Sequence, residues 1–426
     1  MPEIRPFAGI RYAASHLSAD VLAPPFDVIG ERQRRTFADR SSHNIVLLDK
    51  GPEGHDDAWY EQAAALKDQW LVEGVLQMDA SPAFYGYQQV FTLQGASYTR
   101  TGFIAAVRLA PWGQGIHPHE RTRTGDRADR LKLTRAMRAN MSPVFGLYRD
   151  PEGIVDPLLR VPSRPLLDRA CVDDVEHTFW RIDDPLDVQR LQGYFAEEDI
   201  VIADGHHRYE TALAYQAEMR DGETERALTR PYDYVMMYLT NTGAPGLIVL
   251  PTHRMVNLPQ VDQESLLHKL GHTFEIFPLS DQSKLGDTLM AASSDSVSLA
   301  MVTQDMGVFV LRLKSGPHDT IHDEASDSSL LHGLDVVVLQ ERILGPLLGI
   351  SHDTLAASTA VSYTTDAELA LEAVRTRQAQ LAFVLNATTT DQVWQAATRG
   401  LAMPQKSTFF HPKLLTGLVM NPLGIE

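Results

Sequence analysis

The segment from Asp199 to Tyr215, DIVIADGHHRYETALAY, constrains the fold of this chain more than any other stretch. Its run of β-branched residues, bounded by turn residues, predicts a short buried strand over 199–203. Asp204 and Gly205 then predict a tight turn, since glycine allows a positive φ or close approach to a ligand. Apolar residues recur at helical spacing from His206 onward, so the segment predicts a strand, a turn and a helix.

The first turn of this helix carries His206, His207 and Arg208. The first N–H groups of a helix have no acceptor within the helix, and the helix dipole adds partial positive charge there. Imidazole and guanidinium donors on the same turn suit phosphate oxygens. The alternative is a plain strand-to-helix connection with capping or solvated histidines. The whole Gly-His-His-Arg sequence after a buried strand favours an anion site.

Composition excludes several classes of function. The 426 residues suffice for two or three domains, and 44% hydrophobic with 22% charged residues is typical of globular proteins. A net charge of −17 argues against a nucleic-acid partner but allows a small phosphorylated ligand in a local basic pocket. Cys171 is alone in the sequence, so no internal disulfide can form; we expect a buried structural thiol in a reducing compartment.

The sequence shows no membrane or secretory pattern. Its start, MPEIRPFAGIRY, lacks a basic segment followed by a long apolar one. Apolar runs such as 247–250 and 336–339 are far shorter than the ~20 residues of a membrane helix. We therefore expect a soluble, cytoplasmic protein with no membrane partner, while its oligomeric state stays open.

Hydrophobic periodicity predicts an α/β (α+β) fold. The first half reads as a helix over 57–76 and strands over 83–93, 98–109, 143–149, 232–241 and 247–250, with a hairpin link at Gly95 and an irregular loop over 150–167. The second half reads as helices over 264–272, 283–292, 335–348 and 367–378 and strands over 297–303, 308–313 and 382–385. These elements divide into a catalytic core at 1–255, a second α/β scaffold or lid domain at 256–400, and a C-terminal segment at 401–426.

A second informative stretch spans 115–140. A proline-ordered loop with His117, His119 and Glu120 precedes seven basic residues, namely Arg121, Arg123, Arg127, Arg130, Lys132, Arg135 and Arg138. This pattern predicts either a mobile basic loop and helix that close over an anionic substrate, or a solvated helix, where charge runs usually lie. Positive charge beside Glu120 should keep its carboxylate ionised and able to accept a proton from a bound hydroxyl.

Other loops supply the remaining candidate site residues, which are Asp27, His253, Arg254, Lys406, Ser407 and Thr408. Two adjacent prolines present Asp27 in a fixed way, although it could equally cap the turn before the helix that follows Gly30. His253 and Arg254 follow the predicted strand at 247–250 and could reach a shared anion site. The last three residues could form a phosphate or carboxylate clamp, or an exposed loop.

Several well-known motifs are absent from the sequence. There is no P-loop, no protein-kinase H-R-D and D-F-G set, no H-E-x-x-H and no dinucleotide fingerprint. A metal-dependent hydrolase remains an alternative, because His117, His119, Glu120, His206 and His207 could surround a transition metal. Adjacent histidines at the start of a helix point in different directions, however, so only one of that pair would normally ligate.

Two resemblances follow from these motifs. The motifs at Arg5-Pro6-Phe7, 23–29, 119–120, 203–213, 250–254 and 403–418 identify the chain as a member of the bacterial domain-of-unknown-function family 1015, over essentially its full length. Pro118-His119-Glu120, then Asp204 to Arg208, then Pro404-x-Lys406-Ser407-Thr408 resemble in kind and order the motifs of the free serine kinases of the ParB/sulfiredoxin superfamily. About 85 residues separate Glu120 from Gly205, so the resemblance implies a ParB/sulfiredoxin-like core with a large insertion.

The second resemblance implies roles for these residues. Glu120 would act on the acceptor hydroxyl, and Gly205, His206, His207 and Arg208 would hold nucleotide phosphates. Asp204 would position Mg²⁺, and Lys406 with Thr408 would complete the site from the returning C-terminal segment. Outside these roles, His119 and Asp27 are further catalytic candidates, and His253, Arg254 and Ser407 are further phosphate-binding candidates.

The implied activity is phosphoryl transfer from ATP or ADP to a small hydroxylated metabolite, first of all free L-serine to O-phosphoserine. A nucleotide-binding or nucleotide-hydrolysing regulatory module is the alternative from another class.

Overall fold

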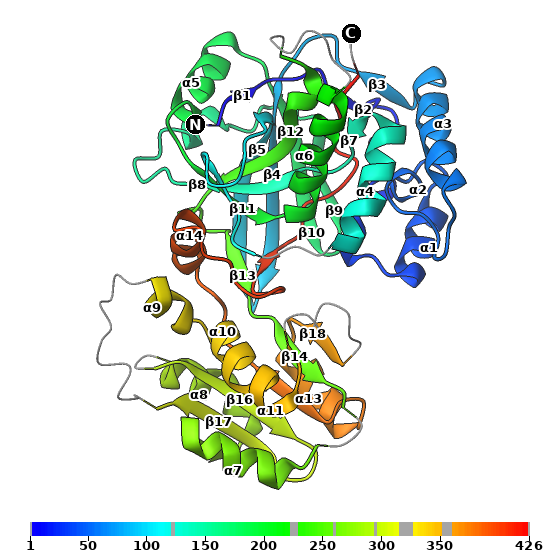
Figure 1. Cartoon of the computed structure of the whole chain (residues 1–426). Helices are drawn as coiled ribbons and strands as arrows, with labels where there is room; N and C mark the ends of the chain where they lie inside the picture. Colours follow the sequence, from blue (N-terminus) through cyan, green and yellow to red (C-terminus); the bar gives the residue numbers. More distant parts are fainter. Residues whose placement is uncertain are drawn as a thin grey trace. The chain divides into compact units, whose positions relative to one another are not determined.

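The computed structural model describes residues 2–120, 124–221, 229–258, 261–293, 296–314, 327–351 and 360–424. The chain forms two compact units. Unit 1 comprises Met1–Pro118, Thr122–Ile248 and Pro412–Glu426, and unit 2 comprises His119–Arg121 and Val249–His411. Both units combine sheets with helices (Figure 1), so the α/β fold class predicted from the sequence is confirmed.

Unit 1 is built on a large mixed sheet. Within the described residues it has nine strands in the order β6-β11-β8-β12-β5-β4-β10-β9, with β1 paired to β5. The strands are β1 (Ile4–Arg5), β4 (Phe84–Leu93), β5 (Ala96–Arg108), β6 (Ile116–His117), β8 (Val144–Tyr148), β9 (Leu167–Val172), β10 (Val175–Ile182), β11 (Ile200–Asp204) and β12 (Tyr234–Asn241). Only the pairs β6–β11 and β8–β12 are parallel in this sheet as described. Short pairs join β2 (Ile10–Tyr12) to β3 (Leu76–Met78) and β7 (Ala139–Asn140) to β21 (Asn421–Pro422).

Helices cover the sheet of unit 1. They are α1 (Glu31–Arg40), α2 (Val46–Asp49), α3 (Ala58–Val72), α4 (Thr124–Met137), α5 (Pro185–Phe195) and α6 (His206–Asp221), with short 3₁₀ turns η1 (Ala19–Val21), η2 (Phe26–Val28), η3 (Asp156–Leu158) and η4 (Pro231–Asp233). Leu191 and Phe195 of α5 join Phe103, Ile200 and Met237 of the strands in one apolar core. On the other side of the unit, α4 packs against both α3 and α6 (Figure 1).

The C-terminal segment 412–424 completes the core of unit 1. Its apolar side chains Leu414, Leu415, Leu418, Val419, Met420 and Leu423 are buried. The fully buried guanidinium of Arg100 donates to the carbonyl oxygen of Pro412, and Gln89 Nε2 donates to the carbonyl oxygen of Lys413 at 2.9 Å. The last described residues are therefore held by polar bonds as well as by apolar burial.

Unit 2 is built on an antiparallel sheet in the order β15-β17-β16-β19-β14-β18. Its strands are β14 (His253–Val256), β15 (Phe274–Leu279), β16 (Ser298–Thr303), β17 (Gly307–Leu313), β18 (Val361–Thr364) and β19 (Leu381–Val384); short strands are β13 (Ile248–Leu250), at the unit boundary, and β20 (Phe409–His411). Its helices are α7 (Gln263–Thr273), η5 (Gln282–Lys284), α8 (Leu285–Ala292), α9 (Asp327–His332), α10 (Asp335–Leu339), η7 (Gln340–Leu344), α11 (Gly345–Leu348), α13 (Ala367–Arg375) and α14 (Thr390–Thr398).

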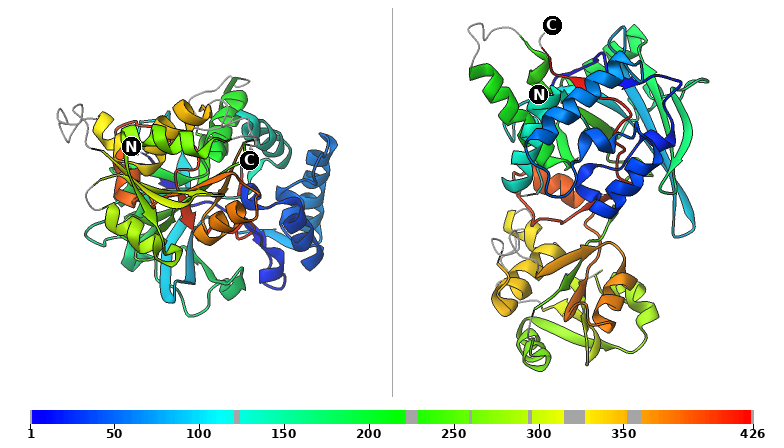
Figure 2. Two further views of the ribbon diagram at one scale, coloured as in Figure 1. Left: turned by 90° about the horizontal axis from the view of Figure 1, so that it is seen from below. Right: turned by 90° about the vertical axis from the view of Figure 1, so that its right-hand side faces the viewer.

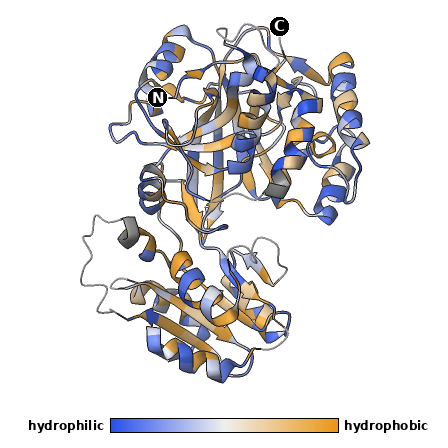
Figure 3. Ribbon diagram, viewed as in Figure 1, coloured by the Kyte–Doolittle hydropathy of each residue, from blue (hydrophilic) through white to orange (hydrophobic). Residues whose placement is uncertain are grey.

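Both faces of this second sheet are covered. Ala300 and Val302 of β16 pack in one core with α8 and α13. The alternate residues Leu299 and Met301 point to the other face and are fully buried too. The views of Figure 2 show helices around this sheet, and Figure 3 shows its apolar strands between them. Among the described helices of the chain, none has the length and apolarity needed to cross a membrane.

The structure confirms the central sequence prediction. The strand predicted at 199–203 is β11, and α6 begins at His206. The predicted hairpin around Gly95 is formed by β4 and β5. The helix predicted at 335–348 is a helical run whose middle part, Gln340–Leu344, is π-helical.

The expectation of a buried Cys171 is wrong. This thiol is exposed. Its strand, β9, is the outermost strand of the large sheet, so the residue lies on an edge that has a neighbour on one side.

Candidate active site

The turn between β11 and α6 requires a glycine. Gly205 has a φ of +91°, a backbone conformation that residues with a Cβ rarely adopt. A Cβ at this position would also lie 2.8 Å from Nε of Arg208 and 2.9 Å from its Nη2. The Arg208 side chain therefore folds back over the turn, and the absence of a side chain at Gly205 makes room for its guanidinium.

Two cations flank the carboxylate of Asp204. Nη2 of Arg208 lies 3.5 Å from Oδ2 of Asp204, and Nη1 donates to the carbonyl oxygen of Pro143. Nζ of Lys413 donates to the same carboxylate oxygen at 3.1 Å. Lys413 was not predicted from the sequence, since it lies 209 residues away from Asp204.

Both histidines lie on the first turn of α6, as predicted. His206 is buried and His207 is half-buried. The helix starts with the N–H of Tyr209 donating to the carbonyl oxygen of Gly205 at 3.0 Å. The N–H groups before Tyr209 lie at the N-terminal end of α6, where the helix dipole places partial positive charge. This arrangement is chemically suited to an oxyanion.

A small polar pocket lies beside Arg208, and we name it the α4–α6 pocket. Its charged and polar lining includes Asp49, Arg130, Asn140, Ser142 and Arg208, and its free volume is about 40 Å³. Arg130 is almost fully buried and its Nη1 donates to the backbone oxygen of Asp49 at 2.8 Å. Burial raises the pKa of Asp49, whereas the charges of Arg130 and then Arg208 lower it.

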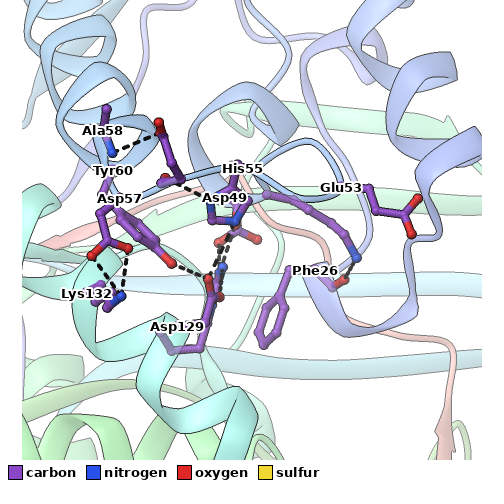
Figure 4. Close-up of polar contacts among 12 residues, drawn as sticks. Phe26, Asp49, Glu53, His55, Asp57, Ala58, Tyr60, Asp129 and Lys132 are labelled. Carbon is purple, nitrogen blue, oxygen red and sulfur yellow. Dashed lines mark hydrogen bonds and ion pairs between the residues drawn. The ribbon is translucent and has the colours of Figure 1, made fainter.

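Several contacts fix Arg130. Its Nε donates to Asp129 Oδ2 at 2.7 Å, and its guanidinium lies 4.0 Å from the centre of the Phe26 ring. Asp129 in turn accepts from the hydroxyl of Tyr60 at 2.7 Å (Figure 4). These bonds tie α4 to α2, α3 and the η2 turn.

The other basic residues of this stretch differ from Arg130. Lys132 pairs with Asp57 at 2.7 Å, and Arg135 pairs with Glu218 at 2.6 Å, both on the surface. Arg121 and Arg123 lie outside the described residues. The solvated-helix alternative thus accounts for Lys132 and Arg135, whereas Arg130 is buried at the candidate site.

Asp27 belongs to the same region of unit 1. It is exposed in the η2 turn. Burial lowers the pKa of Lys50, and the charge of Asp27 opposes this effect. Lys50 donates to the carbonyl oxygen of Phe26 at 2.7 Å, next to Asp27. The helix that follows, α1, has Gly30 rather than Asp27 as its N-cap.

Unit 2 brings together two motifs that are far apart in the sequence. The N–H of Lys406 donates to Oε1 of Glu120 at 2.9 Å. The N–H of Met403 donates to the carbonyl oxygen of His119 at 2.8 Å, and Nε2 of His119 lies 3.0 Å from the hydroxyl of Thr408. The Pro-His-Glu loop is therefore anchored on the 403–408 turn.

The buried residue Arg254 stabilises the 403–408 turn. Its Nη2 donates to the carbonyl oxygen of Lys406 at 3.0 Å. Burial lowers the pKa of Arg254 to about 10, against the opposing effects of Tyr363 and Glu120. Glu120 thus interacts with a buried positive charge and accepts a backbone hydrogen bond.

The remaining candidates of unit 2 have different surroundings. His253 follows β13, as predicted, and begins β14, and its Nδ1 accepts the N–H of Leu385 at 3.2 Å. Burial lowers the pKa of His253 to about 4. Ser407 is buried and donates to the carbonyl oxygen of Pro404 at 2.5 Å. The Lys406 side chain is exposed, and its backbone has a φ of +58°.

The structure places the candidates in two sets. Asp27 and the residues from Asp204 to Arg208 belong to unit 1, whereas Glu120, Arg254 and the 403–408 turn belong to unit 2. Asp204 does not fit a resident magnesium ion, because Lys413 and Arg208 already flank its carboxylate. Among the described residues no group of three or more His, Cys, Asp or Glu side chains is arranged to hold a metal.

The fold and the site define a mixed α/β protein with a cationic strand-turn-helix motif. The chain belongs to the family described as "Protein of unknown function (DUF1015)", whose sequence model matches residues 4–337. No curated protein matches the sequence.

The solved structures to which this chain is similar include three kinds of protein. A free serine kinase mutant in complex with AMP has 11% identity and a TM-score of 0.37, over 72% of this chain and 87% of that one. SbnI with a C-terminal truncation, from Staphylococcus aureus, has 12% identity and a TM-score of 0.37, over 75% and 87%. A conserved hypothetical protein from Pyrococcus furiosus has 12% identity and a TM-score of 0.35, over 74% and 92%.

Proposed function

We propose that this protein is a phosphotransferase that moves a phosphoryl group from ATP or ADP to a small hydroxylated metabolite, with free L-serine as the first candidate. One observation carries the proposal: a guanidinium held by Asp204 and the Pro143 carbonyl oxygen lies against the first turn of α6. Phosphoryl transfer depends on positioning and charge neutralisation more than on covalent help from the protein. A preorganised cationic turn is suited to both tasks.

In this proposal the Asp204–Arg208 turn holds the phosphates of the donor. Backbone N–H groups at the start of α6, the two imidazoles and the Arg208 guanidinium are the donors to phosphate oxygens. Asp204 keeps Arg208 and Lys413 in place through its paired carboxylate. Magnesium would come with the nucleotide, which is the usual way this ion enters such sites.

Glu120 acts on the acceptor in this proposal. Its carboxylate accepts the N–H of Lys406 and faces the charge of Arg254, and both interactions favour the ionised form that can accept a hydroxyl proton. His119 orients the neighbouring Thr408 hydroxyl, and the exposed ammonium of Lys406 supplies a mobile positive charge. The order of these motifs, which resembles that of the free serine kinases, supports the assignment.

Phosphorus NMR tests this proposal directly. Purified protein is mixed with magnesium, ATP or ADP, and a panel of L-serine, L-threonine, L-homoserine and glycerol. The proposal expects a new phosphoester signal with one acceptor. Free phosphate alone would indicate a nucleotide hydrolase or regulatory module, and an unchanged spectrum would reject phosphoryl transfer. Elemental analysis of the same sample checks for a transition metal, which a metal-dependent hydrolase would contain.

A further inference from the structure

The α4–α6 pocket has polar and charged lining residues in addition to Arg208 of the Asp204–Arg208 turn. Its charged lining residues are two guanidinium groups, Arg130 and Arg208, and one carboxylate, Asp49. Arg130 is paired with Asp49 and Asp129, and Arg208 is paired with Asp204, so each guanidinium group has a carboxylate partner. Guanidinium N–H groups that line a polar pocket are suited to an oxyanion.

Both guanidinium groups are fixed without any ligand. Arg130 is held by Asp49, Asp129 and the Phe26 ring, and Arg208 is held by Asp204 and the Pro143 carbonyl oxygen. A ligand that binds here does not have to order these long side chains. Preorganised charges of this kind bind at a lower entropic cost than mobile ones.

Two neutral side chains add hydrogen-bond donors to the same pocket. Ser142 lines the pocket and is only 8% exposed. Oδ1 of Asn140 accepts from the N–H of Met236 and from Nδ2 of Asn421, each at 3.0 Å, which leaves its NH₂ group as a donor. The Ser142 hydroxyl and the Asn140 NH₂ group can therefore donate to the oxygen atoms of a ligand in the pocket.

We propose that the α4–α6 pocket binds an oxyanion group of the ligand, either a phosphate or a carboxylate, with Arg208, Ser142 and Asn140 as donors and Arg130 as a fixed neighbouring charge. The inference rests on the proposed function and deepens it, because it assigns a bounded subsite to the group that Arg208 holds. Phosphate would come from the nucleotide, and carboxylate from an amino-acid acceptor. Planar guanidinium donors suit both kinds of oxyanion.

Calorimetric titration of the full chain tests the subsite without relying on turnover. The probes are ADP, inorganic phosphate, L-serine, and ethanolamine, which has the hydroxyl and amine of serine but no carboxylate. Ser142→Ala removes one hydroxyl at little risk to the fold, and Ser97→Ala on the exposed part of β5 is its control. Ser142→Ala should weaken the bound oxyanion about tenfold, the usual effect of losing one hydrogen bond to a charged group.

A second pair of variants tests the charge. Arg130→Met together with Asp49→Asn removes both members of the buried pair, while Asp129, which also contacts Arg130, keeps its hydrogen bond from the Tyr60 hydroxyl. Arg135→Met on the same helix removes an exposed, paired guanidinium and serves as control. The double variant should weaken the same probe at least tenfold, and Arg135→Met should leave its affinity unchanged.

The pattern of losses identifies the ligand group. Weakened ADP and phosphate binding with normal L-serine binding indicates a phosphate subsite. Weakened L-serine binding, with no binding of ethanolamine to the wild-type chain, indicates a carboxylate subsite.

The proposed subsite is rejected if Ser142→Ala and the double variant bind every probe with wild-type affinity. It is also rejected if the controls Ser97→Ala and Arg135→Met lose as much affinity as these variants do. If transfer then still occurs in the NMR assay, the proposed function stands without this subsite. If the wild-type chain binds no probe and transfers nothing, both proposals are rejected.

Discussion

Arg208 is half-buried, and its guanidinium contacts the Asp204 carboxylate and the Pro143 carbonyl oxygen, so its removal should separate function from folding. In Arg208→Ala, Asp204 keeps Lys413 as a partner, and the glycine turn loses only the side chain folded over it. We expect phosphoryl transfer to fall by at least 100-fold, in line with about 3 to 4 kcal/mol for one preorganised donor. The NMR assay measures the rate, and circular dichroism checks the fold.

Arg190→Ala on the exposed surface of α5 is the matched control for Arg208→Ala. This variant should turn over at the wild-type rate. Near-normal transfer by Arg208→Ala would remove the turn from the mechanism.

Glu120→Gln keeps the shape of the side chain and its bond from Lys406 but loses the negative charge. We expect the affinity for ADP to stay within about twofold and transfer to fall by about 10² to 10⁴, the usual contribution of a general base. Calorimetry and the transfer assay measure the two quantities on the same preparation. Glu218→Gln, an exposed member of an ion pair, is the control, and equal loss of nucleotide binding and transfer in Glu120→Gln would show a structural role instead.

His253 should make the stability of unit 2 depend on pH. Its pKa in the folded protein is about 4, below the 6.5 expected without burial. Between these values the unfolded chain binds more protons, so the free energy of unfolding falls as the pH drops from 6.5 to 4, by about 3 kcal/mol. In His253→Asn an amide oxygen can accept the Leu385 N–H, and urea unfolding should show a smaller loss between pH 7 and pH 4.5. An identical loss in both proteins would contradict this cause.

Sequence reasoning identified residues whose chemistry is local. Gly205 and Arg208 lie in one short motif, and the structure explains both from the geometry of a single turn. Lys413 and Ser142 could not be identified in this way, since their roles depend on partners or a pocket formed by distant segments. Arg130 was one of seven similar basic residues, and only burial distinguishes it from Arg135.

At the scale of elements, the 403–408 turn is strained at Lys406. A residue with a Cβ at a φ of +58° costs roughly 1 to 2 kcal/mol relative to the right-handed conformation, and glycine avoids this cost. Lys406→Gly should therefore keep the bond to Glu120 and melt no lower than Lys406→Ala. Both variants lose the exposed ammonium, so both should raise the KM for the nucleotide about tenfold.

Calorimetric scanning and steady-state kinetics measure these two effects separately. A wild-type KM in both variants would show that the Lys406 side chain does not contribute to nucleotide binding. A melting temperature of Lys406→Gly below that of Lys406→Ala would show that the left-handed backbone at this position carries no strain.

Element prediction succeeded where the periodicity was strong. The β4–β5 hairpin and the β11–α6 unit follow from alternating or helical patterns and a glycine between them. β9, β10 and α5 were missed, because a proline-rich stretch before them gave no clear start to a regular pattern. Cys171 was misplaced for a related reason: only the sheet order shows that its strand lies at an edge.

At the scale of the whole molecule, the last described residues should decide the stability of unit 1. Truncating one buried leucine or methionine typically costs 2 to 5 kcal/mol, and a whole domain is stable by only about 5 to 15 kcal/mol. A chain that ends at His411 lacks the six buried apolar side chains of the 412–424 segment and the carbonyl partner of Arg100. We expect the amides of β4 and β5 to lose their protection against hydrogen exchange, while those of β16 and β17 keep it. Full protection in β4 and β5 would show that the segment is dispensable.

The division into a catalytic core at 1–255, a scaffold or lid at 256–400 and a returning tail stays a prediction from the sequence. The topology, in which a late segment pairs with an early one, could not be read from local patterns. β21 lies 281 residues from its partner strand β7 at the closest pair. Such pairing depends on the complete three-dimensional core rather than on any single stretch.

The position of residues 412–424 also sets an order of events during synthesis. Ribosomes release the chain from its N-terminus, so residues 249–411 emerge before the segment that finishes unit 1. A nascent chain can thus fold unit 2 before unit 1, because unit 1 is incomplete until residues 412–424 have been synthesised. Asp204 can contact Lys413 only after residue 413 has been synthesised, so polypeptides that stop before this residue never assemble the paired charges around the Asp204–Arg208 turn.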